Sequence, residues 1–132
     1  MTTHFIDIET NRREEMIEIS DRIRPLLDSC ISGICNAFVA HTTCGMTINE
    51  NADPDVQHDM LLFLRELVPQ DYTGFRHFEH NSDSHIKSSL LGSSVTFPVK
   101  DGRPLLGRWQ GIYLCEFDGP RNRTVAVSVI EG

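Results

Sequence analysis

The sequence predicts a single α+β domain over residues 1–132, in which two longer helices and one short helix lie against a largely antiparallel β-sheet. Three observations predict this class. Short apolar or alternating segments recur along the chain, amphipathic segments with helical spacing lie between them, and the final third holds extended segments separated by turns. A chain of 132 residues, 39% of them hydrophobic, is long enough for one buried core.

The first third is predicted to contain a strand, a helix and a second strand. Phe5-Ile6-Asp7-Ile8-Glu9 alternates apolar and polar residues as a half-buried strand does. From Glu14 to Cys30, apolar residues at three- and four-residue steps predict a helix, which Pro25 weakens in its later part. Ile34 to Ala40 is predicted as a buried strand.

A polar segment from His41 to Pro54 joins this strand to the next helix and is the most informative stretch of the chain. It combines imidazole, hydroxyl, amide and carboxylate groups, and binding or catalytic groups concentrate on such connections. Asp53 as the side-chain cap and Pro54 at the first helical position predict a helix that runs to about Val68. Its predicted buried face consists of Met60, Phe63, Leu64 and Leu67.

The segment after this helix is rich in histidine. Tyr72 to His80 is predicted as extended or looped, and a short helix follows, which Gly92 ends. His77, His80 and His85 have spacings that match no single-helix ligand pair, so a shared metal would require two elements. The alternative is that each is an ordinary surface histidine.

The final third is predicted as an antiparallel meander. Its strands are Ser94 to Lys100, Leu105 to Phe117 and Arg123 to Ile130, with turns at Asp101-Gly102 and Asp118-Gly119-Pro120.

Within the second of these strands, period two places Gln110 and Glu116 on one face. If that face is internal, the Glu116 carboxylate needs a cation, a metal or a hydrogen-bond donor, because an unpaired buried charge is costly. Arg121 and Arg123 are the nearest candidates in sequence, and a purely structural salt bridge is the alternative to a functional role.

Charge and composition narrow the classes of partner. The formal net charge of -7 argues against a partner bound mainly through a phosphate backbone, so we expect no nucleic acid. No apolar run suits a membrane span and no secretory signal is visible, which predicts a cytoplasmic protein. The cysteines form no C-x-x-C pair and are expected to be reduced thiols, with Cys44 of interest only because it lies in the polar segment.

Several motifs in a fixed order carry a resemblance to a known family. They are His41-Thr42-Thr43, Thr47-Ile48-Asn49-Glu50-Asn51-Ala52-Asp53, Arg76-His77, His85, Ser88, Leu90-Leu91-Gly92, Gly107-Arg108-Trp109-Gln110-Gly111-Ile112-Tyr113-Leu114-Cys115-Glu116 and Gly119-Pro120-Arg121. With these motifs the chain resembles the YjbQ family over nearly its whole length. The resemblance implies a compact α+β fold built around a β-sandwich-like sheet core, assembly as a homotrimer and secondary thiamine-phosphate synthase activity. It also implies a polar pocket made of His41, Thr43, Asn49, Glu50, Asp53, His77, His85, Gln110, Glu116 and Arg121.

The function implied by this resemblance is the joining of a pyrimidine-methyl pyrophosphate to a thiazole phosphate, with release of pyrophosphate. Two alternatives stay open: a trimeric ligand- or metal-binding protein without a catalytic role, and a metal-assisted hydrolase of a small phosphorylated compound. If the protein is a trimer, the pocket is expected to lie between subunits, with His41 and His85 from different chains.

Handling pyrophosphate in an acidic chain calls for a divalent metal or well-placed arginines. Magnesium would take oxygen ligands such as Glu50, Asp53 or Glu116, whereas zinc would prefer His41, His77 and His85, which are also the expected acid-base set. The residues expected to contact phosphate are Arg121, Arg123 and Lys87.

Overall fold

Two antiparallel sheets form the body of the protein in a computed structural model that describes residues 1–29 and 31–132. Sheet A has five strands in the order β1-β8-β3-β5-β6, and sheet B has three in the order β2-β7-β4. The strands are β1 (Thr2–Glu9), β2 (Glu15–Glu18), β3 (Gly33–Val39), β4 (Cys44–Glu50), β5 (Ser94–Lys100), β6 (Arg103–Pro104), β7 (Gln110–Glu116) and β8 (Asn122–Glu131). The helices are α1 (Ser20–Ile23), the 3-10 helix η1 (Arg24–Leu26), α2 (Pro54–Leu67) and α3 (Ser82–Leu91). The predicted α+β class with a sandwich-like core is therefore confirmed.

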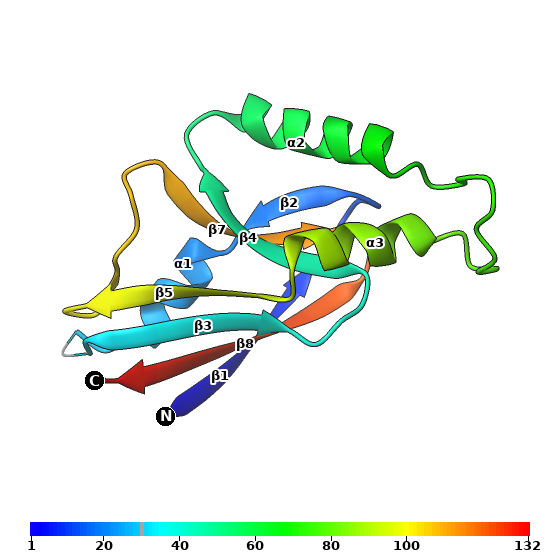
Figure 1. Ribbon diagram of the computed structural model, residues 1–132. Coiled ribbons are helices and arrows are strands. Elements are labelled where there is room, and N and C mark those ends of the chain that lie inside the picture. The colour runs from blue at the N-terminus through cyan, green and yellow to red at the C-terminus, as the bar shows by residue number, and fades with distance from the viewer. Residues whose placement is uncertain (30) are drawn as a thin grey trace.

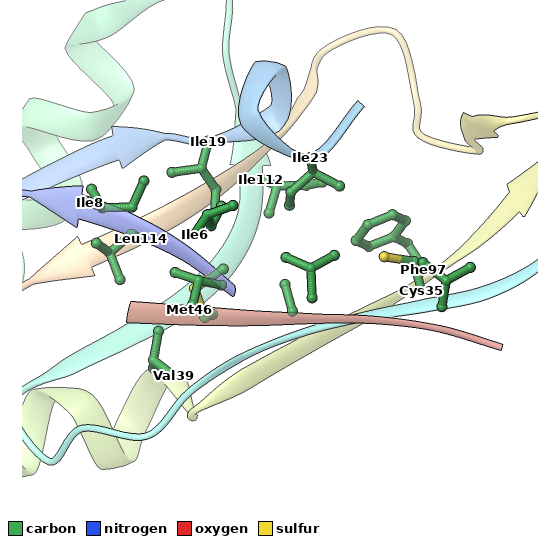
Figure 2. Close-up of a cluster of buried hydrophobic side chains, with 14 of the residues drawn as sticks. Ile6, Ile8, Ile19, Ile23, Cys35, Val39, Met46, Phe97, Ile112 and Leu114 are labelled. Atoms are coloured by element: carbon green, nitrogen blue, oxygen red, sulfur yellow. The ribbon is translucent and has the colours of Figure 1, made fainter. Parts of the chain in front are cut away.

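The core lies between the two sheets. Figure 2 shows aliphatic side chains from β1, β3, β4 and β7 directed toward one another, with Ile19 and Ile23 closing one side. In β7 the two faces are both buried: Ile112 and Leu114 belong to this core, while Tyr113 and Cys115 face a second, smaller cluster on the other side. The alternation predicted for this strand is confirmed, and burial of both faces explains its nearly continuous apolar sequence.

The helix predicted from Glu14 to Cys30 is wrong, although its last residue lies outside the described part. The segment instead forms β2, α1 and η1, with Met16 and Ile17 opposite Cys115 and Leu114 of β7. Pairing with β7 supplies backbone hydrogen bonds in place of those of a helix and packs Ile17 and Met16 against two different apolar clusters, and the β-branched Ile17 suits a strand.

The predicted meander is also wrong, because its strands do not pair with one another. β5 and β8 lie on either side of β3 in sheet A, whereas β7 lies between β2 and β4 in sheet B. The chain thus passes from one sheet to the other between successive strands, except from β5 to β6, which both belong to sheet A. The polar segment after His41 contains a strand of its own, β4, which the sequence did not reveal as one.

The helix after Asp53 is confirmed, and its cap is the predicted one, since Asp53 accepts a hydrogen bond from the Asp55 N–H at 2.9 Å. Its predicted buried face is only partly correct: Leu64 is partly buried against the cluster of Tyr113, Cys115 and Phe117, whereas Phe63 and Leu67 are exposed. No residue of α2 is buried, and Phe63 and Leu67 expose 62% and 56% of their surface. In Figure 1 the helix lies on the outer side of sheet B, away from the core.

The charged residues before β2 are joined to α3 by a buried ion cluster. Lys87 places its ammonium 2.8 Å from Asp83 and 2.9 Å from Glu14, and the Arg13 guanidinium lies 3.0 Å from Asp83. Lys87 and Asp83 are essentially inaccessible to solvent. The prediction that Lys87 contacts phosphate is therefore wrong for this arrangement, because both of its neighbours are carboxylates within the fold.

No helix in the described residues is both long enough and apolar enough to cross a membrane.

Candidate functional site

A polar groove lies between the β3–β4 loop, helix α3 and the β7–β8 loop. It consists of two adjoining hollows of about 480 and 360 Å³, which share His41, Thr42 and His85. We call these joined hollows the histidine groove. Its lining is Ala40, His41, Thr42, Thr43, Cys44, Glu79, Asn81, His85, Ser88, Ser89, Gly92, Ser93, Asp118, Arg121 and Arg123.

Helix α3 is held against β4, which brings His85 to the groove. The Met46 N–H donates to the carbonyl of Gly92 at 3.0 Å, and Gly92 has a φ of 96°, a conformation that favours glycine. Gly45 lies so close to this point that an added Cβ would come within 2.9 Å of the Gly92 carbonyl oxygen. The small residue in β4 therefore permits the close approach of α3, which Figure 1 shows running beside β4.

A buried Glu116–Arg123 pair forms the floor of the groove. Arg123 donates from Nε to Glu116 Oε1 at 2.9 Å and from Nη2 to Glu116 Oε2 at 2.5 Å. Nη2 also donates to Thr43 Oγ1 at 2.8 Å, and Thr10 Oγ1 donates to Glu116 Oε1 at 2.8 Å. The carboxylate further accepts from the backbone N–H groups of residues 117 and 118. This pair confirms that Glu116 is internal and that an arginine just after the turn compensates its charge.

Burial lowers the pKa of Arg123, but its hydrogen bond to Glu116 and the nearby negative charges outweigh that effect, so the pKa is raised. The guanidinium therefore stays charged. Because the network reaches the end of β1 through Thr10, the β3–β4 loop through Thr43 and the β7–β8 loop through Glu116, it holds together the segments that shape the groove.

His41 is held in one orientation by the backbone. Its Nε2 accepts a hydrogen bond from the Thr124 N–H at 3.0 Å, which in the neutral ring places the proton on Nδ1 and makes that atom a donor. Burial and the charge of Arg123 lower the pKa of His41, so the neutral form prevails at neutral pH. His41 thus offers the groove an uncharged N–H group.

A line of polar contacts follows the other wall of the groove. Arg121 donates from Nη2 to Asp118 Oδ2 at 3.1 Å, and Asn81 Nδ2 donates to the same oxygen at 2.8 Å. Asn81 Nδ2 also lies 3.5 Å from Glu79 Oε2, and His77 Nε2 lies 3.5 Å from the same oxygen of Glu79.

The ten predicted site residues separate into two groups. His41, Thr43, His85, Glu116 and Arg121 line the histidine groove or its floor, and His77 adjoins it, with its ring centroid 5.8 Å from that of His85. Asn49, Glu50, Asp53 and Gln110 lie at the opposite end of the β4–β7 pair, where Glu50 is opposite Gln110 while Cys44 is opposite Glu116. Six residues of extended strand separate these ends by about 20 Å.

The second group makes hydrogen bonds within the fold. The Glu50 carbonyl accepts from Tyr113 Oη at 2.8 Å and from Gln57 Nε2, and Gln110 Oε1 accepts from the Gly107 N–H at 2.7 Å. Glu50 and Asp53 are thus far from Glu116, so these three carboxylates do not form one magnesium site within a chain.

The positions of the three histidines bear on the expected subunit interface and on the expected metal site. His41 and His85 line the same groove within one chain, so their meeting does not require a second subunit, and a pocket between subunits stays a prediction. Within the described residues, no three His, Cys, Asp or Glu side chains are arranged to hold a metal. Since His41 Nε2 is already a hydrogen-bond acceptor and the rings of His77 and His85 meet edge to face, the three histidines do not fit a shared metal here, and a metal cofactor stays a prediction.

Cys44 lines the groove but is only 1% exposed, and burial raises the pKa of its thiol to about 11. The thiolate is the reactive form of cysteine, so Cys44 is not an activated nucleophile. Cys35 and Cys115 are likewise buried and free, whereas Cys30 lies outside the described residues.

Sequence reasoning missed Glu79, Asn81 and Asp118 as lining residues. Asn81 immediately precedes a helix and Asp118 belongs to a turn motif, so each residue has a sufficient local explanation. No local pattern indicates that residues 37 positions apart, such as Asn81 and Asp118, share a hydrogen bond.

Comparison with known proteins gives one family. The family model described as UPF0047 protein YjbQ-like matches residues 4–132. A UPF0047 protein of Methanocaldococcus jannaschii is 53% identical over 129 residues, covering 93% of this chain and 90% of that protein. The UPF0047 protein YugU of Bacillus subtilis is 46% identical and covers 95% of this chain and 96% of that protein.

Solved structures give the same result. An uncharacterized protein of the yjbq/upf0047 family from Clostridium acetobutylicum has a TM-score of 0.92 and 42% identity, covering 96% of this chain and 99% of that one. A conserved hypothetical protein from Thermus thermophilus has a TM-score of 0.92 and 41% identity, with the same coverage.

These findings correct the prediction of a thiamine-phosphate synthase. The similar proteins are named only as UPF0047 proteins or as uncharacterized, and no printed name carries that activity. The two alternatives, a trimeric ligand- or metal-binding protein without catalysis and a metal-assisted hydrolase, have no support in these names either.

Proposed function

Because the chain belongs to the YjbQ-like UPF0047 family, and the names of its relatives state no activity, we propose a function from the groove itself: the histidine groove binds the phosphate group of a small molecule. Whether chemistry follows binding is a separate question. Such a group needs several N–H donors that converge on one place and are not already used within the fold.

The observation that carries this proposal is that one guanidinium nitrogen of Arg123, Nη1, has no hydrogen-bond partner within the described residues. Its Nε and Nη2 are occupied by Glu116 and Thr43, whereas Nη1 has no hydrogen-bond partner in residues 1–29 and 31–132. Arg123 is 3% exposed and lines the groove, so this nitrogen is a donor held rigidly at its floor. A preorganised donor binds an anion without the cost of ordering a flexible side chain.

Two further donors support the same site. His41 supplies Nδ1–H, as described above, and Arg121 has a free Nη1 because its Nε and Nη2 donate to Asp118. Arg121 lies in the β7–β8 connection, Arg123 at the start of β8 and His41 in the β3–β4 connection, and the Glu116–Arg123 network fixes the positions of these segments. Together they could surround the oxygens of one phosphate.

Replacing Arg121 by glutamine is expected to weaken the binding of ethyl phosphate about 10-fold, because the Arg121 side chain is half exposed and its charge-assisted hydrogen bond should contribute about 1.5 kcal/mol, the lower end of the usual range. Isothermal titration calorimetry measures the dissociation constant. Arg103→Gln, which removes the same charge from an exposed position in β6 remote from the groove, is the matched control. Absence of binding by the wild-type protein, or equal weakening in both variants, would contradict the proposed site.

We also propose that the protein assembles with itself, as a homotrimer. The outer face of sheet A carries apolar side chains that nothing in the described chain covers: Phe5, Ile34, Phe38 and Ile130 expose between 40% and 72% of their surface. Phe5 and Phe38 lie on either side of Ala126, so they form part of one row across the sheet. Uncovered apolar sheet faces of this kind are typical of interfaces.

A second uncovered apolar surface lies on α2, where Phe63 and Leu67 are exposed. Figure 1 shows α2 beside sheet B, whereas β1, β3 and β8 form the other side of the molecule. Two different apolar surfaces on one chain suit a ring, in which each subunit presents unlike surfaces to its two neighbours. The proposed number of subunits, three, rests on the resemblance to the YjbQ family.

Phe5→Asp is expected to shift the protein from a trimer toward the monomer, because it places a charge in an apolar interface. Size-exclusion chromatography with light scattering measures the mass. Thr73→Asp, in the exposed connection between α2 and α3, adds the same charge away from both apolar surfaces. If the wild-type mass equals that of one chain, the assembly proposal fails.

A further inference from the structure

Among the described residues, the histidine groove and its floor carry three carboxylates and two guanidinium groups, which restricts the anion that the groove could accept. Arg121 is paired with Asp118 at 3.1 Å and Arg123 with Glu116 at 2.5 Å, and Glu79 adds another carboxylate that is about half exposed. The whole chain carries a formal net charge of -7. A phosphate dianion with no positive charge of its own is therefore attracted to the groove less strongly than a phosphate that carries a cation.

The acidic wall also contains an acceptor that the fold leaves unused. Asn81 is 5% exposed and lines the groove, and its Oδ1 is the one fully buried side-chain polar atom without a hydrogen-bond partner in the described chain. The hydrogen bond from Asn81 Nδ2 to Asp118 at 2.8 Å sets the orientation of the amide, so Oδ1 stays an acceptor. A buried acceptor without a donor costs free energy, and a bound donor would remove that cost.

The acceptors lie next to the proposed phosphate donors. Contacts link Glu79 to Asn81, Asn81 to Asp118 and Asp118 to Arg121 in an unbroken series along the wall. A ligand whose phosphate reaches Arg121 and Arg123 would therefore place its adjoining atoms beside Asn81 and Glu79.

From this arrangement, and resting on the proposed phosphate site, we propose that the ligand is a phosphorylated amine, whose ammonium group lies against Glu79 and Asn81. The ammonium supplies the donor that Asn81 Oδ1 lacks and a positive charge for the Glu79 carboxylate. It also offsets one of the two negative charges of the phosphate, so that the ligand enters the groove with a net charge of about -1 in place of about -2. The chemical class is a zwitterion with phosphate and ammonium a short distance apart.

The test compares two probes that differ only in the amine: phosphoethanolamine and ethyl phosphate. The wild-type protein is expected to bind phosphoethanolamine about three- to five-fold more tightly, the size of effect that a partly exposed ion pair gives. Glu79→Gln is expected to bring this ratio close to one while leaving the affinity for ethyl phosphate nearly unchanged. Glu66→Gln removes the same charge from an exposed position on α2, outside the groove, and is expected to keep the ratio.

The outcomes separate this inference from the proposal on which it rests. Equal binding of both probes by the wild-type protein would overturn the ammonium site and leave the phosphate site standing. A preference that persists in Glu79→Gln would overturn the placement of the ammonium. Failure of both probes to bind would overturn the phosphate site and, with it, the inference.

Discussion

Glu116→Ala is expected to lower the free energy of unfolding by about 3 to 5 kcal/mol, because it leaves the Arg123 guanidinium charged and without its partner in the interior. The Arg123 side chain is 4% exposed, so water cannot replace the lost carboxylate. The change also removes the acceptor for Thr10 Oγ1 and for the backbone N–H groups of residues 117 and 118. Urea-induced unfolding, followed by circular dichroism, measures the loss.

A second variant distinguishes an unpaired charge from a simple loss of packing. The double substitution Glu116→Leu with Arg123→Met removes both charges, and it is expected to cost less than the sum of its two single changes. Some loss should remain, because the backbone donors of the turn stay without an acceptor. Glu66→Ala, at an exposed position on α2, should change stability little. A double variant that costs as much as the summed singles would show that the pair is not coupled.

The accuracy of the sequence-based predictions depended on whether local chemistry or tertiary pairing decides an element. The α2 start was predicted correctly because Asp53 caps the helix through its own neighbour, Asp55. The prediction of a helix from Glu14 was wrong because the segment pairs with β7, about 100 residues later in the chain. The spacing of its apolar residues suits a helix, but the tertiary pairing decides the structure. Periodicity alone could not show that Met16 and Ile17 face opposite sides of a strand.

The same distinction holds for the groove. His41 could be proposed because it follows a buried strand, and Glu116 because a carboxylate within a buried strand needs a partner. Their meeting with His85 and Asn81 depends on the packing of α3 against β4, which no local pattern indicates. The motif residues Glu50 and Gln110 look like members of the same site in sequence, yet the register of β4 and β7 places them at the opposite end of the strands.

The prediction that Phe63 and Leu67 of α2 are buried was wrong for a different physical reason. Its apolar stripe is a real amphipathic pattern, and the sequence was correctly interpreted as one, but nothing in the described chain covers Phe63 and Leu67. A hydrophobic stripe predicts that a helix packs against something, not that the partner belongs to the same chain. The uncovered stripe is therefore itself an argument for self-assembly.

Disrupting the ion cluster beneath α3 is expected to give the second large loss in the free energy of unfolding. Asp83→Asn is expected to cost about 3 kcal/mol at neutral pH, because Asp83 is fully buried between Lys87 and Arg13 and its charge compensates both. Glu14 remains near Lys87, so the cluster is weakened and not abolished. Asp101→Asn, in the exposed turn after β5 where asparagine tolerates the positive φ, is the matched control and should be nearly neutral.

The pH dependence of this loss identifies its cause. Burial raises the pKa of Asp83, but the hydrogen bonds and charges of Arg13 and Lys87 outweigh it, so the pKa lies below its ordinary value of 3.8. A carboxyl group whose pKa is lowered by folding stabilises the native state above the unfolded pKa, and this stabilisation is lost as the pH falls through the folded pKa. The difference in unfolding free energy between wild type and Asp83→Asn should therefore be constant from about pH 7 to about pH 5 and shrink below about pH 4. A difference that stays the same at acid pH would mean that the amide perturbs packing, and that the charge of Asp83 contributes nothing to holding α3 in place beside the groove.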